Sequence, residues 1–573
     1  MTDYRKDYDK WAAFDGLDTE LAAEIAAIKD DDAAIRERFS SPLAFGTAGL
    51  RGILRAGTNG MNVFTVAQAT QGLAALVKKH HGEERGVVIA CDTRHKSDEF
   101  SRVCARVLAA NGVKAYLFDG PRPTPELSFA LRHLRAISGI NITASHNPKE
   151  YNGYKAYWED GAQISPEQAA VVSDAIASVD IFTGVKSCDF DEAVRGGKIV
   201  IIGKDVDEAY LTVVLAERIH KDAIPAAKDL KVVYTPFHGT GYRLVPEALL
   251  RAGLKKENFF PVPEQMIPDG DFPTVKSPNP EDKAGFALAV EIAKREGANL
   301  LIGTDPDADR TGVIVRTHED EFLPLSGNQI GAMMLAYIID ARQAEGRLPA
   351  GAAAVRSIVS TPLADRICEA NGVTLVEVLT GFKFIGEKIK EWESTHEHTF
   401  IFGFEESYGY LSGTYARDKD AVCASLLITE MAAYYAAKGL TLYDVLCGLF
   451  EKYGRFKESV ESLAFPGLDG AARMKTLMNG LRNDAPKVLA GETVAVFADY
   501  LRGVKVCGGK EEPTGLPLSD VLFFGLANGD RVYIRPSGTE PKVKVYYLVS
   551  AKDEKAADEK IAALKGAMKA LTD

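Results

Sequence analysis

The chain has 573 residues, of which 46% are hydrophobic and 26% are charged, and its formal net charge is −12. This length exceeds what one hydrophobic core supports and predicts about three to five domains of roughly 100–200 residues each. The excess of negative charge argues against nucleic acid or an anionic membrane surface as the main partner. An acidic chain that binds phosphates must therefore gather its cations locally.

The seven cysteines are scattered and lack any Cys-x-x-Cys spacing. We therefore expect reduced thiols rather than a disulfide framework or a zinc site. The charged N-terminus lacks the apolar segment of a signal peptide, and no apolar run reaches the roughly 20 residues that a membrane-spanning helix needs. Together these features predict a cytoplasmic protein without a membrane anchor. Oligomeric state is not predicted by any feature of the sequence.

Residues 1–40 alternate small apolar side chains with acids and lysines, a pattern typical of one or two amphipathic helices. Beyond Pro42, short Val/Ile-rich runs such as 86–91 alternate with Ala/Leu-rich segments such as 100–111. Strands that alternate with helices indicate α/β units around largely parallel or mixed sheets. We therefore expect a helical extension that is followed by α/β domains.

A loose internal repeat suggests that several of these domains are related. Thr-Pro pairs followed by apolar, helix-like stretches begin at Thr124, Thr235 and Thr361, and each precedes an apolar strand that ends in a polar loop. Their intervals differ, so the repeat lacks the fixed period of a solenoid. Two-residue pairs also recur by chance, and this pattern alone leaves both interpretations open. Related domains would each offer one loop to a shared cleft beyond the carboxyl ends of their strands.

The chain changes character near Phe456. From there, short β-type segments lead to a turn at 535–541, then to the strand-like run 543–549 and a final helix rich in Ala, Lys and Glu. This order of elements predicts a smaller α+β domain at the C-terminal end.

The most informative loop contains Ser145. It follows the apolar run 136–142, which is typical of a buried strand, and it ends at Pro148. A serine held on such a tight turn beside His146, with Lys155 a few residues on, is well placed to carry a phosphoryl group. Serines at strand ends are common, so this signal gains its weight from the other polar loops.

Three carboxylates alternate after the predicted strand 298–302, at Asp305, Asp307 and Asp309. Carboxylates this close repel one another unless a cation lies between them. Ligands that are all oxygen atoms select a hard ion such as Mg²⁺. The sequence therefore predicts a magnesium site on this loop.

Three different interpretations compete with a magnesium site. An EF-hand is excluded, because its sixth and twelfth positions, Gly and Glu in that motif, are Arg310 and Arg316 here. An aspartyl-phosphate enzyme with Asp307 as the nucleophile stays open. A solvated acidic turn also stays open until the other loops are considered.

Two weaker loops carry groups that suit anions and sugars. The glycine-rich turn 46–52 lets backbone N–H groups approach an anion that Arg51 could clamp, although an ordinary loop is the commoner interpretation. Farther along, Glu405 and Ser407 lie between glycines, where a carboxylate could accept hydrogen bonds from sugar hydroxyls; a surface turn fits equally well. Arg417 follows in a segment with charges of both signs, which also fits a solvated helix start.

The segment 535–542 brings together a guanidinium, two hydroxyls, a glycine and an ammonium, and this combination favours a phosphate site over a plain turn. Lys383 is a weaker candidate, because a single lysine in an apolar setting is as often structural as functional.

In this order, the five loops resemble those of the α-D-phosphohexomutase family, and most of all its phosphoglucomutase branch. The resemblance covers nearly the whole chain beyond the first 40 residues. It implies an α/β fold in which three related α/β domains with mixed sheets and a smaller C-terminal α+β domain surround a central cleft. The implied division is a helical extension at 1–40, a phosphoserine domain at 41–205, a metal-binding domain at 206–322, a sugar-binding domain at 323–455 and a phosphate-binding domain at 456–573.

The resemblance also implies roles for individual residues. Ser145 would be the phosphoserine and would join Asp305, Asp307 and Asp309 around one Mg²⁺ per chain. The residues implied for catalysis are Ser145, His146, Lys155 and Arg51. The residues implied for substrate binding are Arg310, Lys383, Glu405, Ser407, Arg417, Arg535, Ser537, Gly538, Thr539 and Lys542. A proline at position 306, where glycine is more frequent, leaves the carboxylates unchanged.

The implied reaction interconverts α-D-glucose 1-phosphate and glucose 6-phosphate, with glucose 1,6-bisphosphate as intermediate and activator. Phosphomannomutase, phosphopentomutase and glucose-1,6-bisphosphate synthase activities stay open, because none of these residues distinguishes the sugars. An aspartyl phosphatase and a sugar-phosphate-binding regulator without catalysis stay open as well. The expected partners are small sugar phosphates, with no nucleic acid and no membrane. Lys155 is the candidate general acid or base, and we expect neighbouring cations to lower its pKa.

Overall fold

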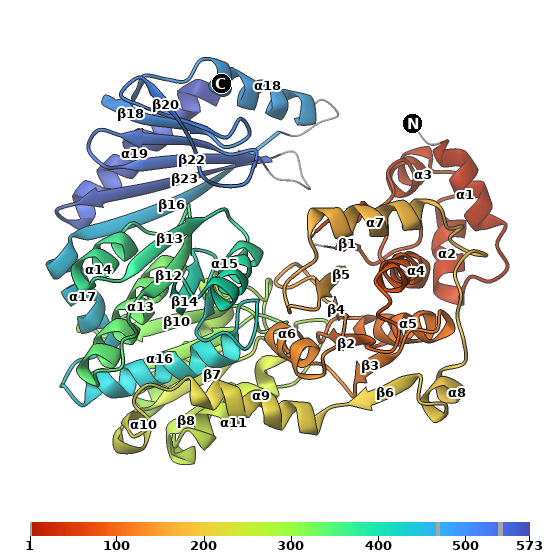
Figure 1. Cartoon of the computed structure of the whole chain (residues 1–573), viewed down its shortest axis with the longest axis horizontal. Coiled ribbons are helices and arrows are strands. Elements are labelled where there is room, and N and C mark those ends of the chain that lie inside the picture. The colour runs from red at the N-terminus through yellow and green to blue at the C-terminus, as the bar shows by residue number, and fades with distance from the viewer. Residues whose placement is uncertain (1–2, 48, 466–469, 537–541, 573) are drawn as a thin grey trace. The chain divides into compact units, whose positions relative to one another are not determined.

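The computed structural model describes residues 3–47, 49–465, 470–536 and 542–572. They form two compact units, many of whose elements are labelled in Figure 1. The first unit comprises Met1–Leu325, Ile389–Ser394 and Gly409–Gly439. The second comprises Ser326–Lys388, Thr395–Tyr408 and Leu440–Asp573. No described helix is long and apolar enough to cross a membrane.

The first unit begins with three helices, α1 (Tyr4–Ala12), α2 (Thr19–Ala27) and α3 (Asp32–Phe39). The sequence predicted one or two. The chain divides further because Asp3, Asp18 and Asp31 each accept a hydrogen bond from a backbone N–H of the following turn, which starts a new helix. The buried side chains of this extension, including Trp11, pack in one hydrophobic cluster with the following domain.

The first sheet of this unit has six strands in the order β1-β5-β4-β2-β3-β6. Their bounds are β1 (Leu50–Ile53), β2 (Val87–Cys91), β3 (Ala115–Phe118), β4 (Ser138–Ile142), β5 (Tyr151–Trp158) and β6 (Ile199–Ile202). Strands β4, β2, β3 and β6 are parallel to one another, and β5 runs antiparallel to both of its neighbours, β4 and β1. Every residue of β2 and β4 is buried, as expected for central parallel strands.

Five helices accompany this sheet: α4 (Val63–Lys79), α5 (Ser97–Ala110), α6 (Thr124–His133), α7 (Pro166–Ala177) and α8 (Phe190–Arg195). Helices α4, α5, α7 and α8 contribute to one hydrophobic core with the strands. Helix α6 packs against β2 and β4 with residues that lie outside that core. Because α6 follows β3 and precedes β4, its first turn lies near the loops at the carboxyl ends of these parallel strands.

The second sheet of the first unit has the order β11-β10-β9-β7-β8. Its strands are β7 (Val232–Thr235), β8 (Phe259–Pro261), β9 (Leu300–Thr304), β10 (Thr311–Arg316) and β11 (Phe322–Pro324), of which β9, β7 and β8 are parallel. Its helices are α9 (Lys204–Ala216), α10 (Ala223–Ala226), α11 (Gly241–Arg251), η1 (Lys256–Asn258), η2 (Lys283–Phe286) and α12 (Ala287–Glu296). Strand β15 (Gly409–Leu411) and helix α16 (Ala421–Ala436) also belong to this unit, and α16 packs against α11.

The second unit contains a parallel arrangement in which β12 (Ala352–Ser357) lies between β13 (Thr374–Val378) and β14 (Thr399–Glu405). Its helices here are α13 (Gly327–Ala344), α14 (Leu363–Asn371) and α17 (Leu442–Tyr453), together with the first half of α15 (Phe382–Thr395). Helix α13 packs against both α14 and β14.

The rest of the second unit is an antiparallel sheet of order β16-β23-β22-β21-β18-β19-β20, with β17 paired to β18. The strands are β16 (Arg455–Ala464), β17 (Val488–Leu489), β18 (Glu492–Asp499), β19 (Val504–Cys507), β20 (Lys510–Pro513), β21 (Leu522–Leu526), β22 (Arg531–Pro536) and β23 (Lys542–Ala551). Helices α18 (Gly470–Asn483) and α19 (Glu554–Thr572) share its hydrophobic core.

Glu458, on β16, gives this unit a pH-dependent stability. Burial raises its pKa from 4.5 to about 7, and hydrogen bonds from Thr361 and Asn328 oppose part of that rise. An acid whose pKa is raised by folding stabilises the protein below its unfolded pKa, and this contribution is lost as the pH rises through the folded value. We expect the free energy of unfolding to fall by about 1–3 kcal/mol between about pH 4.5 and pH 7.

The variant Glu458→Gln should remove this part of the pH dependence. Melting temperatures of both proteins at pH 5 and pH 8 measure the effect, and the wild type should lose more stability than the variant between the two. The neighbouring Glu461→Gln is the matched control, since Glu461 lies on the same strand. Equal losses in the wild type and in Glu458→Gln would contradict the assignment.

Candidate active site

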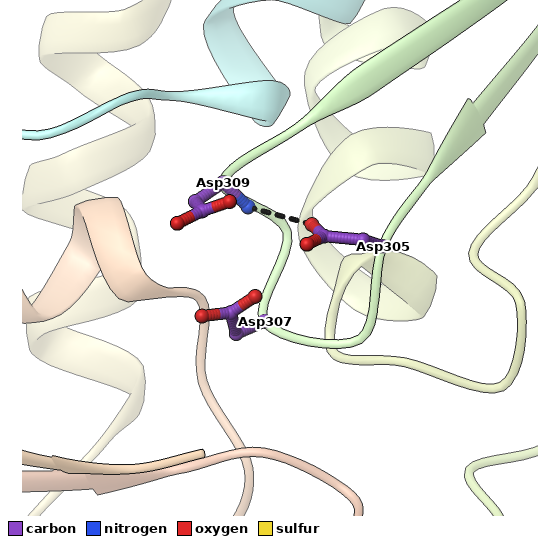
Figure 2. Close-up of side chains that lie close together, drawn as sticks. All are labelled: Asp305, Asp307 and Asp309. Atoms are coloured by element: carbon purple, nitrogen blue, oxygen red, sulfur yellow. Dashed lines mark hydrogen bonds between the residues drawn. The ribbon is translucent and has the colours of Figure 1, made fainter. Parts of the chain in front are cut away.

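The predicted metal loop lies between β9 and β10 of the first unit. The carboxylates of Asp305, Asp307 and Asp309 are all buried, and an oxygen atom of each lies within 4.8 Å of the others. Figure 2 shows the three side chains gathered around one point. The backbone N–H groups of Asp309 and Arg310 donate to Asp305 Oδ1, both at 3.1 Å, which fixes the turn.

The three carboxylates of this triad differ in the charges that surround them. Burial, together with the nearby carboxylates of Asp307 and Asp309, raises the pKa of Asp305 well above its ordinary value. Burial also acts on Asp307, but the Lys155 ammonium outweighs it and holds the pKa of this carboxyl below its usual range. Among the described residues, Asp307 Oδ1 and Asp309 Oδ1 are buried without a hydrogen-bond partner. A hard divalent cation fits such a set of oxygen atoms.

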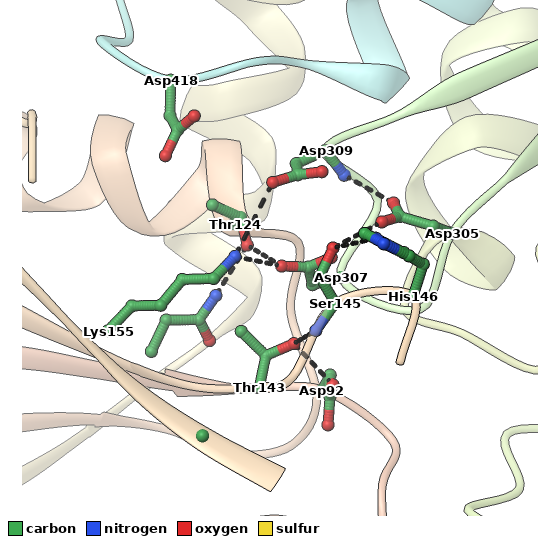
Figure 3. A network of polar contacts seen from close by, with 12 residues as sticks. Asp92, Thr124, Thr143, Ser145, His146, Lys155, Asp305, Asp307, Asp309 and Asp418 are labelled. Atoms are coloured by element: carbon green, nitrogen blue, oxygen red, sulfur yellow. Dashed lines mark hydrogen bonds and ion pairs between the residues drawn. The ribbon is translucent and has the colours of Figure 1, made fainter. Parts of the chain in front are cut away.

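Ser145 lies beside the triad, on the loop that follows β4. Its Oγ donates to Asp305 Oδ2 at 2.9 Å and lies 3.3 Å from Nδ1 of His146. The backbone of Ser145 is left-handed, with φ +52°, and its N–H donates to Thr143 Oγ1 at 2.8 Å. A non-glycine residue with positive φ is uncommon and costs free energy unless its surroundings hold it. Figure 3 shows these contacts together.

Arg94 holds the Ser145 loop through backbone carbonyls. Its guanidinium donates to the carbonyls of Ser145 at 2.5 Å and of Pro148 at 2.8 Å, and also to the carbonyls of Asn147 and Tyr151. Asp92 pairs with Arg94 Nε at 3.2 Å. The same carboxylate accepts from Thr143 Oγ1 at 2.6 Å.

Asp92 and Arg94 were missed from the sequence, although one signal for them exists. They follow β2, which runs parallel to β4, and Cys91 is the register partner of Ile142. The ends of these two strands therefore meet at the same edge of the sheet, and polar residues there are candidates for the same site.

Lys155 lies on β5, opposite Asn141 of β4. Its Nζ is 2.8 Å from Asp307 Oδ2 and 3.7 Å from Asp309 Oδ2. Burial by itself would lower the pKa of Lys155, but these carboxylates outweigh burial and raise it. The expectation of a lowered pKa is therefore wrong, because the nearest charges are anions rather than cations. Lys155 is an ammonium in this arrangement.

Thr124, the first residue of α6, completes the support of the metal loop. Its Oγ1 donates to Asp307 Oδ2 at 2.9 Å, and its backbone N–H donates to the carbonyl of Asp307 at 2.8 Å. The start of α6 is thereby attached to the centre of the triad. The sequence singled out Thr124 only as part of the Thr-Pro repeat.

His146 follows Ser145, and two arginines act on its imidazole. Burial lowers the pKa of His146 well below its ordinary value, and the guanidiniums of Arg310 and Arg51 lower it further. The imidazole is therefore neutral at pH 7. Arg51 also donates to Asn147 Oδ1 at 3.0 Å, and Arg310 Nε lies 3.7 Å from Asp309 Oδ1.

The segment after β15 contributes a lysine that the sequence analysis did not select. Lys419 Nζ lies 3.1 Å from Asp309 Oδ2 and 2.9 Å from Asp418 Oδ1. Asp418 in turn accepts from the hydroxyl of Tyr157 at 2.9 Å. Arg417 was a candidate from the sequence. It is buried, and its guanidinium contacts Glu393 rather than the triad of Asp305, Asp307 and Asp309. Because positive and negative residues alternate in this segment, the sequence does not indicate which side chain faces the triad.

The other predicted substrate residues belong to the second unit. Glu405, at the end of β14, is buried, and its Oε1 accepts from the N–H of Gly381 at 2.7 Å. This contact joins the Glu405 loop to the start of α15, where Lys383 lies. Ser407 is half-buried on the same loop as Glu405.

The predicted phosphate segment of the second unit is described only in part. Arg535 is half-buried near the end of β22, and Lys542 begins β23. Ser537, Gly538 and Thr539 lie outside the described residues.

Comparison with known proteins agrees with this arrangement. Four family descriptions of phosphoglucomutase/phosphomannomutase match the chain in order: alpha/beta/alpha domain I at residues 42–181, domain II at 208–318, domain III at 326–453 and the C-terminal domain at 477–564. The predicted fold class, with three α/β domains, mixed sheets and a different C-terminal domain, is confirmed.

Relatives of known name cover nearly the whole chain. The phosphoglucomutase of Staphylococcus epidermidis is 39% identical over 519 residues, which are 90% of this chain and 92% of that protein. That of Staphylococcus aureus is 38% identical over 547 residues, 94% and 95% of the two chains.

Solved structures show the same fold at lower identity. A putative phosphomannomutase from Thermus thermophilus is 23% identical, with a TM-score of 0.68 over 93% of this chain and 99% of that one. The phosphoglucomutase parafusin from Paramecium is 18% identical, with a TM-score of 0.67 over 93% and 96%. The four family matches and the extent of the named relatives lead to one conclusion: the chain belongs to the phosphoglucomutase/phosphomannomutase family.

Proposed function

We propose that this protein is a phosphoglucomutase, which interconverts α-D-glucose 1-phosphate and glucose 6-phosphate through phospho-Ser145 and glucose 1,6-bisphosphate. The observation that carries the proposal is the contact of Ser145 Oγ with Asp305 inside a buried triad of carboxylates. Relatives named phosphoglucomutase, aligned over about nine tenths of the chain, support glucose as the sugar. The seven free cysteines suit the reducing cytoplasm, and we place the enzyme there.

Asp305, Asp307 and Asp309 are the residues that would hold one Mg²⁺ per chain, together with the oxygen atoms of Ser145 or its phosphate. Their fit rests on the all-oxygen donor set and on the two buried carboxylate oxygens that have no hydrogen-bond partner among the described residues. When bound, the ion neutralises charge on the transferring phosphoryl group.

The reaction requires Ser145 first to donate a phosphoryl group and then to accept one. In the first transfer, the P–O bond to Ser145 Oγ breaks while a bond forms to the free hydroxyl of the bound sugar phosphate. The bisphosphate then turns end for end, and its other phosphoryl group returns to Ser145. Arg51 and Arg310 stabilise negative charge on the phosphoryl oxygens, since both guanidiniums lie close enough to act on the pKa of His146.

In the first transfer the attacking sugar hydroxyl loses a proton, and Ser145 Oγ gains one as its phosphoryl group leaves. In the return transfer the Ser145 hydroxyl loses its proton, and the sugar oxygen that gives up its phosphoryl group gains one. The Nδ1 atom of neutral His146 lies 3.3 Å from Ser145 Oγ, so His146 can exchange a proton with this oxygen atom. Lys155, as an ammonium, keeps Asp307 and Asp309 in place and acts as a general acid.

We propose that further substrate contacts come from residues of the second unit. Glu405 and Ser407 would read the sugar hydroxyls, and Lys383 would orient the sugar. The phosphate that is not being transferred would bind the segment that contains Arg535, Ser537, Gly538, Thr539 and Lys542. The buried carboxylate of Glu405, fixed by Gly381, supports a positioned acceptor rather than a mobile surface group.

The experiment that tests this function is ³¹P NMR of the protein with Mg²⁺ and a trace of glucose 1,6-bisphosphate. Glucose 1-phosphate, mannose 1-phosphate and ribose 1-phosphate are supplied separately. We expect the fastest conversion for glucose 1-phosphate, into glucose 6-phosphate and without inorganic phosphate. Faster conversion of another sugar would reassign the substrate, and release of inorganic phosphate would indicate a phosphatase.

Arg94 gives a prediction about positioning. Arg94→Lys keeps the charge, but a single ammonium cannot donate to the four carbonyls that the guanidinium holds. We expect kcat to fall about 10–100-fold with little change in KM, because Ser145 loses its fixed geometry rather than its substrate contacts.

Steady-state kinetics of this variant measure both parameters. Arg102→Lys, at an exposed arginine of α5, is the matched control and should behave like the wild type. A rise in KM at unchanged kcat would show that Arg94 binds substrate and does not position the serine.

A further inference from the structure

A pocket of about 590 Å³ opens in the first unit at the end of α6 that is farther from Ser145. Helix α6 starts at Thr124, on the metal triad, and ends at His133, about 15 Å along its axis. Strand β5 gives a similar separation, since Glu159 of the pocket lies four residues beyond Lys155, about 13 Å along an extended chain. The pocket is therefore separate from the catalytic cluster.

One wall of this pocket is aromatic. The ring of Phe129 stacks on the imidazole of His133, with 5.2 Å between centroids and 20° between planes. Tyr415 also lines the pocket, and its hydroxyl donates to Asp420 Oδ2 at 2.6 Å. Tyr210 packs against both Phe129 and Tyr415, so the wall is supported from behind. Flat, supported rings of this kind are platforms on which a planar ligand stacks.

The rim of the pocket is basic. Arg85 is paired with Glu159 at 2.7 Å, and Arg132 lies 3.6 Å from Glu393. The side chain of Arg135 makes no ion pair or hydrogen bond with any residue in the part of the chain that the structure describes. In a chain with a net charge of −12, three arginines around one pocket are a local concentration of positive charge.

The chemistry of the lining selects among ligands. A neutral sugar needs carboxylate or amide acceptors for its hydroxyls, and the one carboxylate that lines the pocket, Glu159, is already paired with Arg85. Arginines and aromatic rings together suit a ligand that has phosphate oxygens at one end and a planar ring at the other. The volume lies in the range of small-molecule sites, about 300–1,000 Å³.

We propose that this pocket is a second ligand site, which binds a nucleotide. The base would stack on the exposed imidazole of His133, which the buried ring of Phe129 supports from behind, and the phosphates would reach Arg132 and Arg135. The site goes beyond the proposed function, because it uses no residue of the catalytic cluster.

The test is isothermal titration calorimetry of the full-length protein with ADP. We expect one ADP per chain at the pocket. Arg135→Gln and His133→Ala should each weaken binding at least about tenfold, because one removes a phosphate contact and the other a stacking surface. Both side chains are exposed, so melting temperatures close to that of the wild type are expected. Arg102→Gln, an exposed arginine on α5, is the matched control and should bind ADP normally.

Two further titrations separate this site from the catalytic cluster and from a plain anion site. Arg51→Ala alters the catalytic cluster, and ADP binding that falls in this variant but not in Arg135→Gln would overturn the proposal. Pyrophosphate should bind more weakly than ADP and should be insensitive to His133→Ala; equal binding of both ligands would reduce the pocket to a plain anion site. Absence of ADP binding at millimolar concentration would overturn the proposal as well.

Discussion

Replacement of Ser145 by alanine should lower kcat by at least about 10³-fold, because the proposed route needs the Ser145 hydroxyl as the phosphoryl carrier. Ser145 Oγ is the hydroxyl that donates to Asp305, and the left-handed turn and the Arg94 clamp hold it there. Alanine accepts the same backbone conformation about as well as serine. We therefore expect a folded, inactive protein.

Turnover and thermal melting of Ser145→Ala measure these two expectations. Ser101→Ala is the matched control, since Ser101 is also buried in the first unit and its hydroxyl donates to the Ser97 carbonyl of its own helix, α5. The control should keep most of the activity. Turnover near the wild-type rate in Ser145→Ala would contradict a covalent phosphoserine route and would favour direct transfer or an aspartyl-phosphate route.

Asp307→Asn should abolish the response to Mg²⁺ together with activity, with a loss of kcat of at least about 100-fold. Asparagine keeps the size of the side chain but removes the charge that pairs with Lys155 at 2.8 Å. It also alters the buried carboxylate, one oxygen of which accepts no hydrogen bond from any residue that the structure describes. The change therefore acts on metal affinity and on charge balance at once.

Magnesium titrations of turnover and calorimetric Mg²⁺ binding separate the two effects. Asp418→Asn is the matched control, because Asp418 is buried in the same network but lies outside the triad and pairs with Lys419. It should alter turnover while leaving Mg²⁺ binding close to that of the wild type. Retained Mg²⁺-dependent turnover in Asp307→Asn would place the metal elsewhere.

The resemblance to a known family placed Ser145 and Asp305 in one site before the structure did. Strand geometry alone does not pair them, because Ser145 follows β4 and Asp305 follows β9, which belong to different sheets. Within one sheet, loops at the carboxyl ends of parallel strands gather at one edge, where ligands bind. The same reasoning applied to the end of β2 would have added Asp92 and Arg94.

The sequence did not reveal which charges lie next to which. Lys155 was expected among cations, yet its nearest neighbours are Asp307 and Asp309, and its pKa moves the other way. Lys419 could not be distinguished from Arg417, because both lie in one charged segment and only tertiary packing decides which side chain faces the triad. Periodicity identifies strands and helices, but it does not fix the orientation of side chains on loops.

Single-turnover transfer from the phosphoenzyme tests the central claim most directly. Protein carrying ³²P on Ser145, verified by mass spectrometry of the peptide, is mixed with glucose 1-phosphate and Mg²⁺. The account predicts that the label leaves Ser145 at least as fast as kcat and appears in glucose 1,6-bisphosphate and then in glucose 6-phosphate. Label that stays on the protein while product forms, or that appears only as inorganic phosphate, would contradict it.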